Sequence, residues 1–171
     1  MNRGFLFWSL VLFALVLGGF LIYLNSVMTT STKELKNRVS SMPPLRLVGL
    51  DSTQFRITPG LNTVIIYFNS ECDHCKEELK EVRIGIKLFS GIQLVLMSSQ
   101  ELKDIREFAG TLDLARFENV HFAKIGHDHL ATIFGVLGVP QTFVYDSEGR
   151  LLEIFEGETA IEKIVSSYPQ K

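Results

Sequence analysis

Residues 64–75 read VIIYFNSECDHC, and this stretch decides the fold that the sequence predicts. It opens inside a continuous apolar run, Asn62–Asn69, whose β-branched residues are typical of a strand buried on both faces. It ends on Cys72 and Cys75, which open a segment with helical spacing and helix-favouring residues up to Phe89. The sequence therefore predicts a buried strand that leads directly into a helix carrying a C-x-x-C pair.

The rest of the chain after residue 43 alternates between strand and helix patterns. Short apolar runs bounded by turn residues predict strands, and longer segments with apolar residues three or four apart predict helices. Ser98 or Ser99 is the expected N-cap of the helix that follows the second buried strand. This order predicts an α/β fold, with helices packed around a central mixed sheet. The further strands are expected at 45–49, 54–57, 92–97, 120–125, 141–145 and 151–155, and the further helices at 100–109, 129–135 and 159–168.

The spacing of the two cysteines points to redox chemistry. Residues three apart lie on one face of a helix, which brings Cys72 and Cys75 close enough to form a disulfide. Cys72 comes at the helix N-terminus, where free N–H groups and the helix dipole stabilise a thiolate, so we expect it to be the nucleophile. Cys75 lies one turn further in and is the expected resolving thiol. The alternatives are half of a metal site completed by His127 and His129, and a purely structural disulfide.

Three local patterns resemble the thioredoxin superfamily, over about residues 44–168. They are VIIYFNSECDHC, the loop GVPQT at 138–142, and the hairpin sequence TFVYDSEGRLLEIFEG at 142–157. With the N-terminal apolar segment, they look most like the TlpA/ResA-type redoxins, which are related to the alkyl hydroperoxide reductase and thiol-specific antioxidant families. The resemblance implies a thioredoxin-like sandwich. It also implies a cis bond between Val139 and Pro140, facing the disulfide, where the backbone would pair with a bound substrate strand.

The sequence departs from the superfamily pattern around the cysteines. Thioredoxin has a buried Asp six positions before the first Cys, and Ile66 stands there, so the proton relay needs water, Glu71 or another group. Asp73 and His74 stand between the cysteines, and a protonated His74 would stabilise the Cys72 thiolate and raise the redox potential. Nearby acids would act in the opposite direction through like-charge repulsion. These acids are Glu71, Asp73, Glu77 and Glu78.

The N-terminal part of the chain has a different composition. Residues 4–24 form a run of 21 residues without Asp, Glu, Lys, Arg or His, long enough for a helix to cross a bilayer core of about 30 Å. Its length and the lack of a small-x-small exit favour an uncleaved anchor over a cleaved signal peptide. We therefore expect a short tail at 1–3, a transmembrane helix at 4–24, a polar tether at 25–42 and the thioredoxin-like domain at 43–171.

Composition narrows the function. A net charge of −2 gives no electrostatic case for nucleic-acid binding, and two cysteines are too few for a disulfide scaffold. The sequence carries no motif for a cofactor or a metal enzyme, and neither is expected. We predict a thiol–disulfide oxidoreductase anchored in a bacterial inner membrane, with its domain in the periplasm. Its partners would be envelope proteins bearing thiols or disulfides, and a membrane electron donor or acceptor.

Two other functions stay open on the sequence alone. A thiol peroxidase of the alkyl hydroperoxide reductase/thiol-specific antioxidant type needs a Thr three positions before its reactive Cys, and Asn69 stands there. A non-catalytic binding module with the same fold would use Cys72 and Cys75 only structurally. The reactivity of Cys72 toward an alkylating reagent separates this second alternative from an enzyme.

Overall fold

The fold is described by a computed structural model, which covers residues 3–135 and 138–169. The first helix is described with fewer side chains than the rest, namely those of Trp8, 12–24 and 33–38. Residues 1–2 of the predicted tail and residues 170–171 of the predicted domain lie outside the described part.

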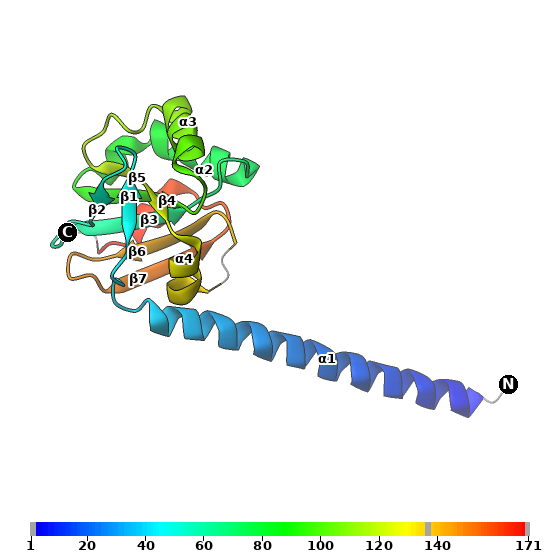
Figure 1. Cartoon of the computed structure of the whole chain (residues 1–171). Coiled ribbons are helices and arrows are strands. Elements are labelled where there is room, and N and C mark those ends of the chain that lie inside the picture. The colour runs from blue at the N-terminus through cyan, green and yellow to red at the C-terminus, as the bar shows by residue number, and fades with distance from the viewer. Residues whose placement is uncertain (1–2, 136–137, 170–171) are drawn as a thin grey trace. The chain divides into compact units, whose positions relative to one another are not determined.

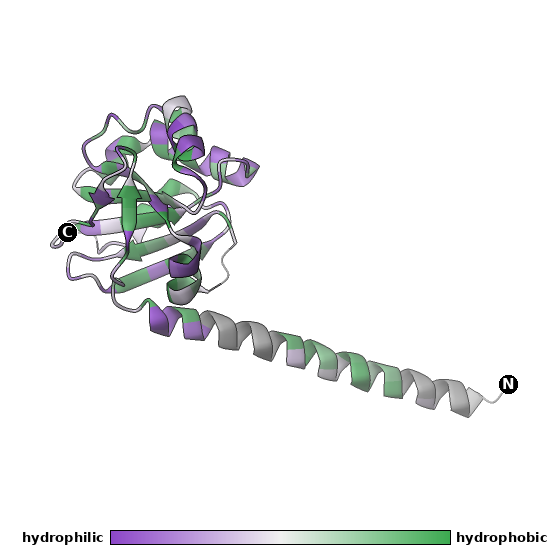
Figure 2. Cartoon of the chain, in the orientation of Figure 1, coloured by the Kyte–Doolittle hydropathy of each residue, from purple (hydrophilic) through white to green (hydrophobic). Residues whose placement is uncertain are grey.

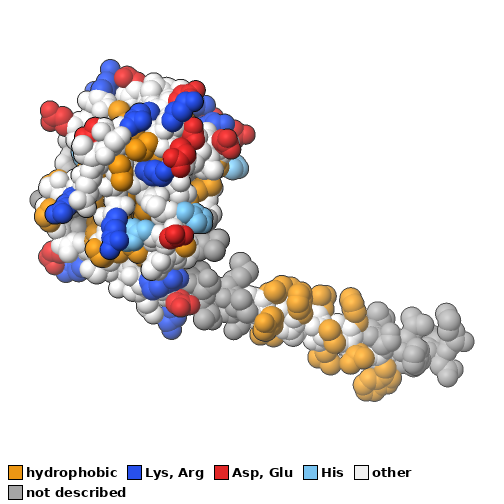
Figure 3. Space-filling model, in the orientation of Figure 1, with side chains coloured by type: hydrophobic (Ala, Val, Ile, Leu, Met, Phe, Trp, Pro, Cys, Tyr) orange, Lys and Arg blue, Asp and Glu red, His pale blue; other side chains and the backbone are white. Residues whose placement is uncertain are grey.

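The chain divides into two compact units, Met1–Asn37 and Arg38–Lys171. The helix α1, Arg3–Arg38, forms nearly all of the first unit (Figure 1). It runs through most of the predicted tether, because neither Gly nor Pro interrupts residues 25–38. Its described middle part is apolar and exposed, as Figures 2 and 3 show. Within the described part of the chain, no helix meets the length and apolarity that a membrane crossing requires.

The described residues of the second unit form one seven-stranded mixed sheet. Its strands are β1 (Leu47–Gly49), β2 (Gln54–Phe55), β3 (Asn62–Tyr67), β4 (Ile92–Ser98), β5 (Val120–Ile125), β6 (Gln141–Tyr145) and β7 (Leu151–Glu156), in the order β2-β1-β5-β4-β3-β6-β7. The neighbouring strands β3, β4 and β5 pair in parallel, and the other pairs are antiparallel. The predicted α/β class and mixed sheet are confirmed.

Helices cover both faces of this sheet (Figure 1). The helices α2 (Asp73–Ile84), α3 (Leu102–Leu112) and α5 (Ile161–Ser166) share one hydrophobic core with β3, β4 and β5. The helix α4 (His127–Phe134) packs on the other face, where the rings of Phe134 and Phe143 lie 4.9 Å apart. All seven residues of β4 are buried, as expected of a strand covered on both sides. The strand β3, which leads to the cysteines, lies beside it.

The helix that carries the cysteines is shorter than predicted. α2 ends at Ile84, and a separate 3-10 turn, η1 (Ile86–Phe89), follows after Gly85. The Gly85 N–H donates to the carbonyl of Glu81 at 2.8 Å, which closes the last turn. A side chain at this position would overlap Ile161 of α5, so glycine permits the two segments to approach closely.

The predicted cap of α3 is wrong. β4 continues through Ser98, and α3 begins only at Leu102, with Glu101 as an N-cap that makes no side-chain capping bond. Ser98 instead donates from its hydroxyl to the amide oxygen of Gln100 at 3.2 Å. The residues between β4 and α3 therefore make contacts at the carboxyl end of β4, next to the end of β3.

Candidate active site

Cys72 lies at the junction of strand, turn and helix that the sequence predicts. β3 ends at Tyr67, and the turn at Asn69 closes with a hydrogen bond from the Cys72 N–H to the Asn69 carbonyl at 3.1 Å. Cys72 has extended backbone angles (φ −79°, ψ 121°) and is the N-cap of α2. Its Sγ accepts a hydrogen bond from the Cys75 N–H at 3.4 Å, so the sulfur occupies the position that favours an anion at a helix N-terminus.

The side chain of Gln100 holds the active-site turn in place. Its amide oxygen accepts from the Ser70 N–H at 2.8 Å, and its amide nitrogen donates to the Ser70 hydroxyl at 3.0 Å. The Asn69 amide oxygen meanwhile accepts from the Glu71 N–H at 2.8 Å. The two Gln100 contacts join the turn before Cys72 to the segment that directly follows β4, the neighbouring strand of the sheet. Sequence reasoning missed Gln100, because nothing local links it to a segment 30 residues earlier.

The predicted cis-proline lies beside Cys72. The Val139–Pro140 bond is cis, which confirms the prediction. The Cys72 thiol lies 3.7 Å from the Val139 carbonyl, to which it donates. Pro140 is buried and Val139 is half-buried. The two segments that the resemblance pairs, 67 positions apart at this contact, therefore meet at the reactive sulfur.

The two thiols differ in exposure, as predicted. Both cysteines are free; Cys72 is half-buried and Cys75 is completely buried. Burial raises the pKa of the Cys75 thiol to about 12, and the neighbouring Cys72 and Glu78 act in the same direction. Cys75 therefore stays protonated until a base takes its proton. The arrangement leaves the Cys72 sulfur partly accessible to solvent and buries the Cys75 sulfur one turn further along the helix.

Glu78, which the sequence analysis names only as one of four nearby acids, is a buried group of the site. It lies three residues after Cys75 on the buried face of α2 and has no exposed surface. Its carboxylate accepts from the Thr142 hydroxyl at 3.1 Å and from the Thr159 N–H at 3.2 Å. Burial raises the pKa of Glu78 from 4.5 to about 7, against the lowering effect of these two hydrogen bonds.

The position of Glu78 answers the question left by Ile66. Ile66 is buried in β3, and its register partner in β6 is Thr142. Because Thr142 donates to Glu78, the helix brings a carboxylate to the region where the strand has none. The signal in the sequence was the spacing of Cys75, Glu78 and Val82, which puts an acid on a helix face that is otherwise apolar.

The raised pKa of Glu78 makes stability depend on pH. Between pH 4.5 and 7 the unfolded state loses this proton while the folded state keeps it, so the free energy of unfolding falls as pH rises through this window. The fall attributable to Glu78 is expected to reach about 3 kcal/mol. Urea unfolding of wild type and Glu78→Gln between pH 4.5 and 8 measures this effect. It is the difference between the two proteins in the slope of unfolding free energy against pH. Glu77→Gln, an exposed neighbour, should keep the wild-type slope; equal slopes for wild type and Glu78→Gln contradict the assignment.

The other predicted residues around the cysteines lie at the surface of the protein. Glu71 and Asp73 are exposed, and Asp73 pairs with Lys76 at 2.8 Å, a contact that lowers the pKa of Asp73. His74 is also exposed, and its Nδ1 lies 2.7 Å from Glu158 Oε2. Glu158 precedes α5 and was not expected at the site. Among the described residues, no hydrogen bond or ion pair joins any of these side chains to Cys75, and Glu78 is the buried acid whose charge acts on the Cys75 thiol.

A groove of about 490 Å³ lies along the cis-proline loop, whose Val139 carbonyl contacts the Cys72 thiol. Its walls bring the dipeptide between the cysteines, the cis-proline loop and the segment before α5 together. It is lined by His74, Glu81, Val139, Pro140, Gly157, Glu158 and Ala160. The alternative metal site is not supported: among the described residues no group of three or more possible metal-ligating side chains is found. His129 Nε2 instead accepts from the Arg46 N–H at 3.1 Å.

No protein-family description and no curated protein sequence matches this chain. Solved structures do match. A secreted disulfide oxidoreductase of Mycobacterium tuberculosis, described as homologous to DsbE of E. coli, is 13% identical, with a TM-score of 0.61 over 77% of this chain and 98% of that one. StoA from Bacillus subtilis is 15% identical, with a TM-score of 0.60 over 75% and 98% of the two chains.

A peroxiredoxin-like protein from Aquifex aeolicus is also similar, at 17% identity and a TM-score of 0.61, over 75% of this chain and 84% of that one. At these identities the likeness is one of fold. It agrees with the resemblance that the strand, the C-x-x-C pair and the proline loop predict. The described domain therefore has the fold of these solved structures.

Proposed function

We propose that this protein is a thiol–disulfide oxidoreductase that works through Cys72 and Cys75. The observation that carries the proposal is the asymmetry of the two thiols. One sulfur caps α2, lies next to the cis-proline loop and is accessible, whereas the other is buried one turn behind it. A structural disulfide would need no such difference, while exchange chemistry needs an accessible attacking thiol and a shielded resolving one.

The exchange follows from this geometry. The Cys72 thiolate attacks one sulfur of a substrate disulfide, forming a mixed disulfide and releasing the other substrate sulfur as a thiolate. Cys75 then loses its proton, attacks Cys72 and displaces the second substrate sulfur, leaving Cys72–Cys75 as a disulfide and the substrate as a dithiol. Glu78 is the buried base that receives the Cys75 proton, because its pKa near 7 lets it hold or release a proton at neutral pH. The reverse sequence oxidises a substrate dithiol.

The groove beside Cys72 supports a protein substrate. An extended segment lying along Val139 and Pro140 would place its own sulfur at Cys72, with its backbone pairing to the loop in the manner of strand addition. Asn69, in the position where a peroxidase needs Thr, is turned toward the Glu71 N–H. This contact supports protein disulfides over peroxide as the substrate.

We further propose that residues 4–24 anchor the protein in a bacterial inner membrane, with the domain on the periplasmic side. Support comes from the uncharged run of 21 residues and from its large apolar side chains, which are exposed at Trp8 and over 12–24, where the structure describes them. A helix with apolar side chains on all sides requires an apolar environment. An oxidising compartment also suits a C-x-x-C protein whose partners are envelope proteins and a membrane electron donor or acceptor.

Reduction of insulin disulfides by the full-length chain with dithiothreitol tests the activity. We expect turnover well above the rate with dithiothreitol alone, and turnover of hydrogen peroxide no faster than background. A midpoint potential near −270 mV would mark a reductant and one near −120 mV an oxidant. Absence of insulin turnover combined with a Cys72 that resists alkylation would favour the non-catalytic binding module.

The topology has a separate test. In a bacterial host, the protein should remain with the membrane fraction after high-salt and alkaline washes and leave it only with detergent. A thiol reagent that cannot cross the inner membrane should label Cys72 in spheroplasts before lysis. Release by salt, or labelling only after lysis, would contradict the proposed anchor and side without bearing on the redox activity.

A further inference from the structure

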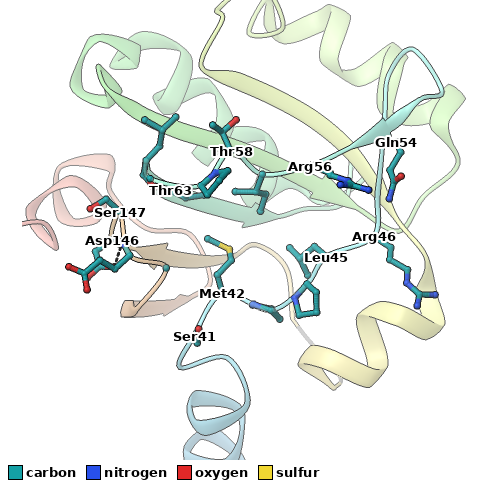
Figure 4. Close-up of a pocket in the computed structure, with 18 of the residues that line it drawn as sticks. Ser41, Met42, Leu45, Arg46, Gln54, Arg56, Thr58, Thr63, Asp146 and Ser147 are labelled. Atoms are coloured by element: carbon teal, nitrogen blue, oxygen red, sulfur yellow. Dashed lines mark hydrogen bonds between the residues drawn. The ribbon is translucent and has the colours of Figure 1, made fainter.

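A second and larger hollow lies at the other end of β3 from the cysteines. Its volume is about 630 Å³, within the range of small-molecule sites. It includes Thr63 near the start of β3, whereas Cys72 follows the end of the same strand. Figure 4 shows the segments that surround it: the chain before β1, the chain between β2 and β3, and the turn between β6 and β7. The proposed redox chemistry at Cys72 therefore does not use this hollow.

The walls of the hollow are held by hydrogen bonds from distant elements. The Met42 N–H donates to the Gly149 carbonyl at 2.7 Å, which fastens one wall to the β6–β7 turn. On the opposite wall, the Thr58 N–H donates to the side chain of Gln93 in β4 at 3.0 Å. The hollow is thus formed before any ligand arrives, which lowers the conformational cost of binding.

Two arginines at one end of the hollow have no anionic partner. Arg46 and Arg56 both line it, and in the described part of the chain neither guanidinium makes a salt bridge or a hydrogen bond. Figure 4 shows them at the same end as Gln54, with Asp146 and Ser147 at the opposite end. The Asp146 carboxylate is paired with Arg150 at 2.8 Å, as is that of Glu148 at 3.0 Å. The two carboxylates share the single charge of Arg150, so the charges of Arg46 and Arg56 leave the hollow with a net positive charge.

Between its ends the hollow is lined mainly by apolar residues. Three of them are prolines, Pro43, Pro44 and Pro59, which have no backbone N–H to offer. A peptide strand would find few main-chain donors along these walls, so strand addition is not the mode of binding that they suit. The remaining apolar lining is Met42, Leu45, Ile57 and Leu61.

We propose that this hollow binds an amphipathic anion, an unbranched apolar chain that ends in a carboxylate or phosphate. The acid head would lie at Arg46 and Arg56, whose planar guanidinium groups pair with both kinds of anion. The apolar chain would lie along the proline-lined walls toward the β6–β7 turn. A free fatty acid and an anionic membrane lipid share this chemistry. The site is separate from Cys72 and does not depend on the proposed redox function.

Methyl NMR of the full-length protein in phosphatidylcholine nanodiscs tests the proposal with decanoate as the probe. We expect saturable shifts of the methyl signals of Met42, Ile57 and Leu61, with methyls of α3 unaffected. The double variant Arg46→Gln/Arg56→Gln should weaken decanoate binding at least about tenfold, since two charge-assisted contacts are lost. Decanol has no charge and cannot make the contacts with the two arginines. Its binding to wild type should therefore be no tighter than the binding of decanoate to the double variant.

The matched control removes two positive charges elsewhere. Lys87→Gln/Lys103→Gln changes the net charge equally, but both lysines are exposed outside the hollow, so decanoate binding should stay at the wild-type level. Replacing part of the phosphatidylcholine with phosphatidylglycerol, without decanoate, identifies the source: shifts of the same three methyls indicate a membrane lipid, and their absence indicates a free acid. No saturable shift with either probe, or equal binding of decanol and decanoate, overturns the proposal.

Discussion

Replacing Cys72 with serine is expected to reduce insulin reduction to the rate of dithiothreitol alone. A serine hydroxyl does not ionise near neutral pH, so the helix N-terminus has no anion to stabilise and no attack on a disulfide occurs. Because Cys72 is half-buried at an N-cap, where serine is also a preferred residue, the fold should persist. Turnover and thermal unfolding measured on the same preparation separate loss of chemistry from loss of structure.

The matched variant is Cys75→Ser. It retains the attacking thiol, so it should react once and then accumulate a mixed disulfide with the substrate that a reducing agent releases. Non-reducing electrophoresis would show this adduct for Cys75→Ser and not for Cys72→Ser. If Cys72→Ser formed the adduct instead, the assigned roles of the two cysteines would be reversed.

The second large effect is expected at Glu78. Cys75 has a pKa near 12, so its attack is slow unless a base removes its proton, and Glu78 is the buried carboxyl three residues away on the same helix face. Glu78→Gln retains the size and hydrogen-bonding capacity of the side chain but cannot accept the proton. Loss of a general base costs about 10²-fold or more, and that decrease is expected in the resolving step alone.

The two steps can be timed in one experiment. Excess aromatic disulfide reagent releases one coloured thiol when Cys72 attacks and a second when Cys75 resolves the mixed disulfide. Glu78→Gln should leave the first phase unchanged and slow the second, and the second phase should lose its dependence on pH near 7. Glu77→Gln, exposed on the same helix, should behave as wild type. An unchanged second phase in Glu78→Gln would remove Glu78 from the mechanism.

The fold class and the placement of the two cysteines at a helix start could be predicted from the sequence because their signals are local. A β-branched run, a C-x-x-C pair and the Val139–Pro140 loop each lie within a few residues, and the bounds of β5 and β6 came out as expected. The failures concern residues whose state depends on distant partners. Ser98 has the residue type of a helix cap, yet it lies in β4, where its register partner is Lys124 of β5. α2 ends before Gly85, where a side chain would overlap Ile161 of α5, 76 positions later.

Glu78 shows the same limit in the site. An acid in the second turn of a helix is usually solvated, and only the approach of β6 and of the segment before α5 turns this one into a buried group. The same holds for His74, which reads as a modulator of Cys72 but lies 2.7 Å from Glu158, a partner 84 residues away. The sequence shows which side chains could do chemistry, but not the distant residues that surround each of them in the fold.

The bonds between Gln100 and Ser70 bear on how the protein meets its substrates. They tie the turn before Cys72 to the end of β4, so the reactive sulfur has the rigidity of the sheet and not that of a loop. A rigid site of this kind does not have to close over its substrate. The flexible segment that brings the two sulfurs together must then belong to the substrate protein. Turnover should then vary little with solvent viscosity for small disulfides, while for folded partners its rate would report how readily they expose their own cysteines.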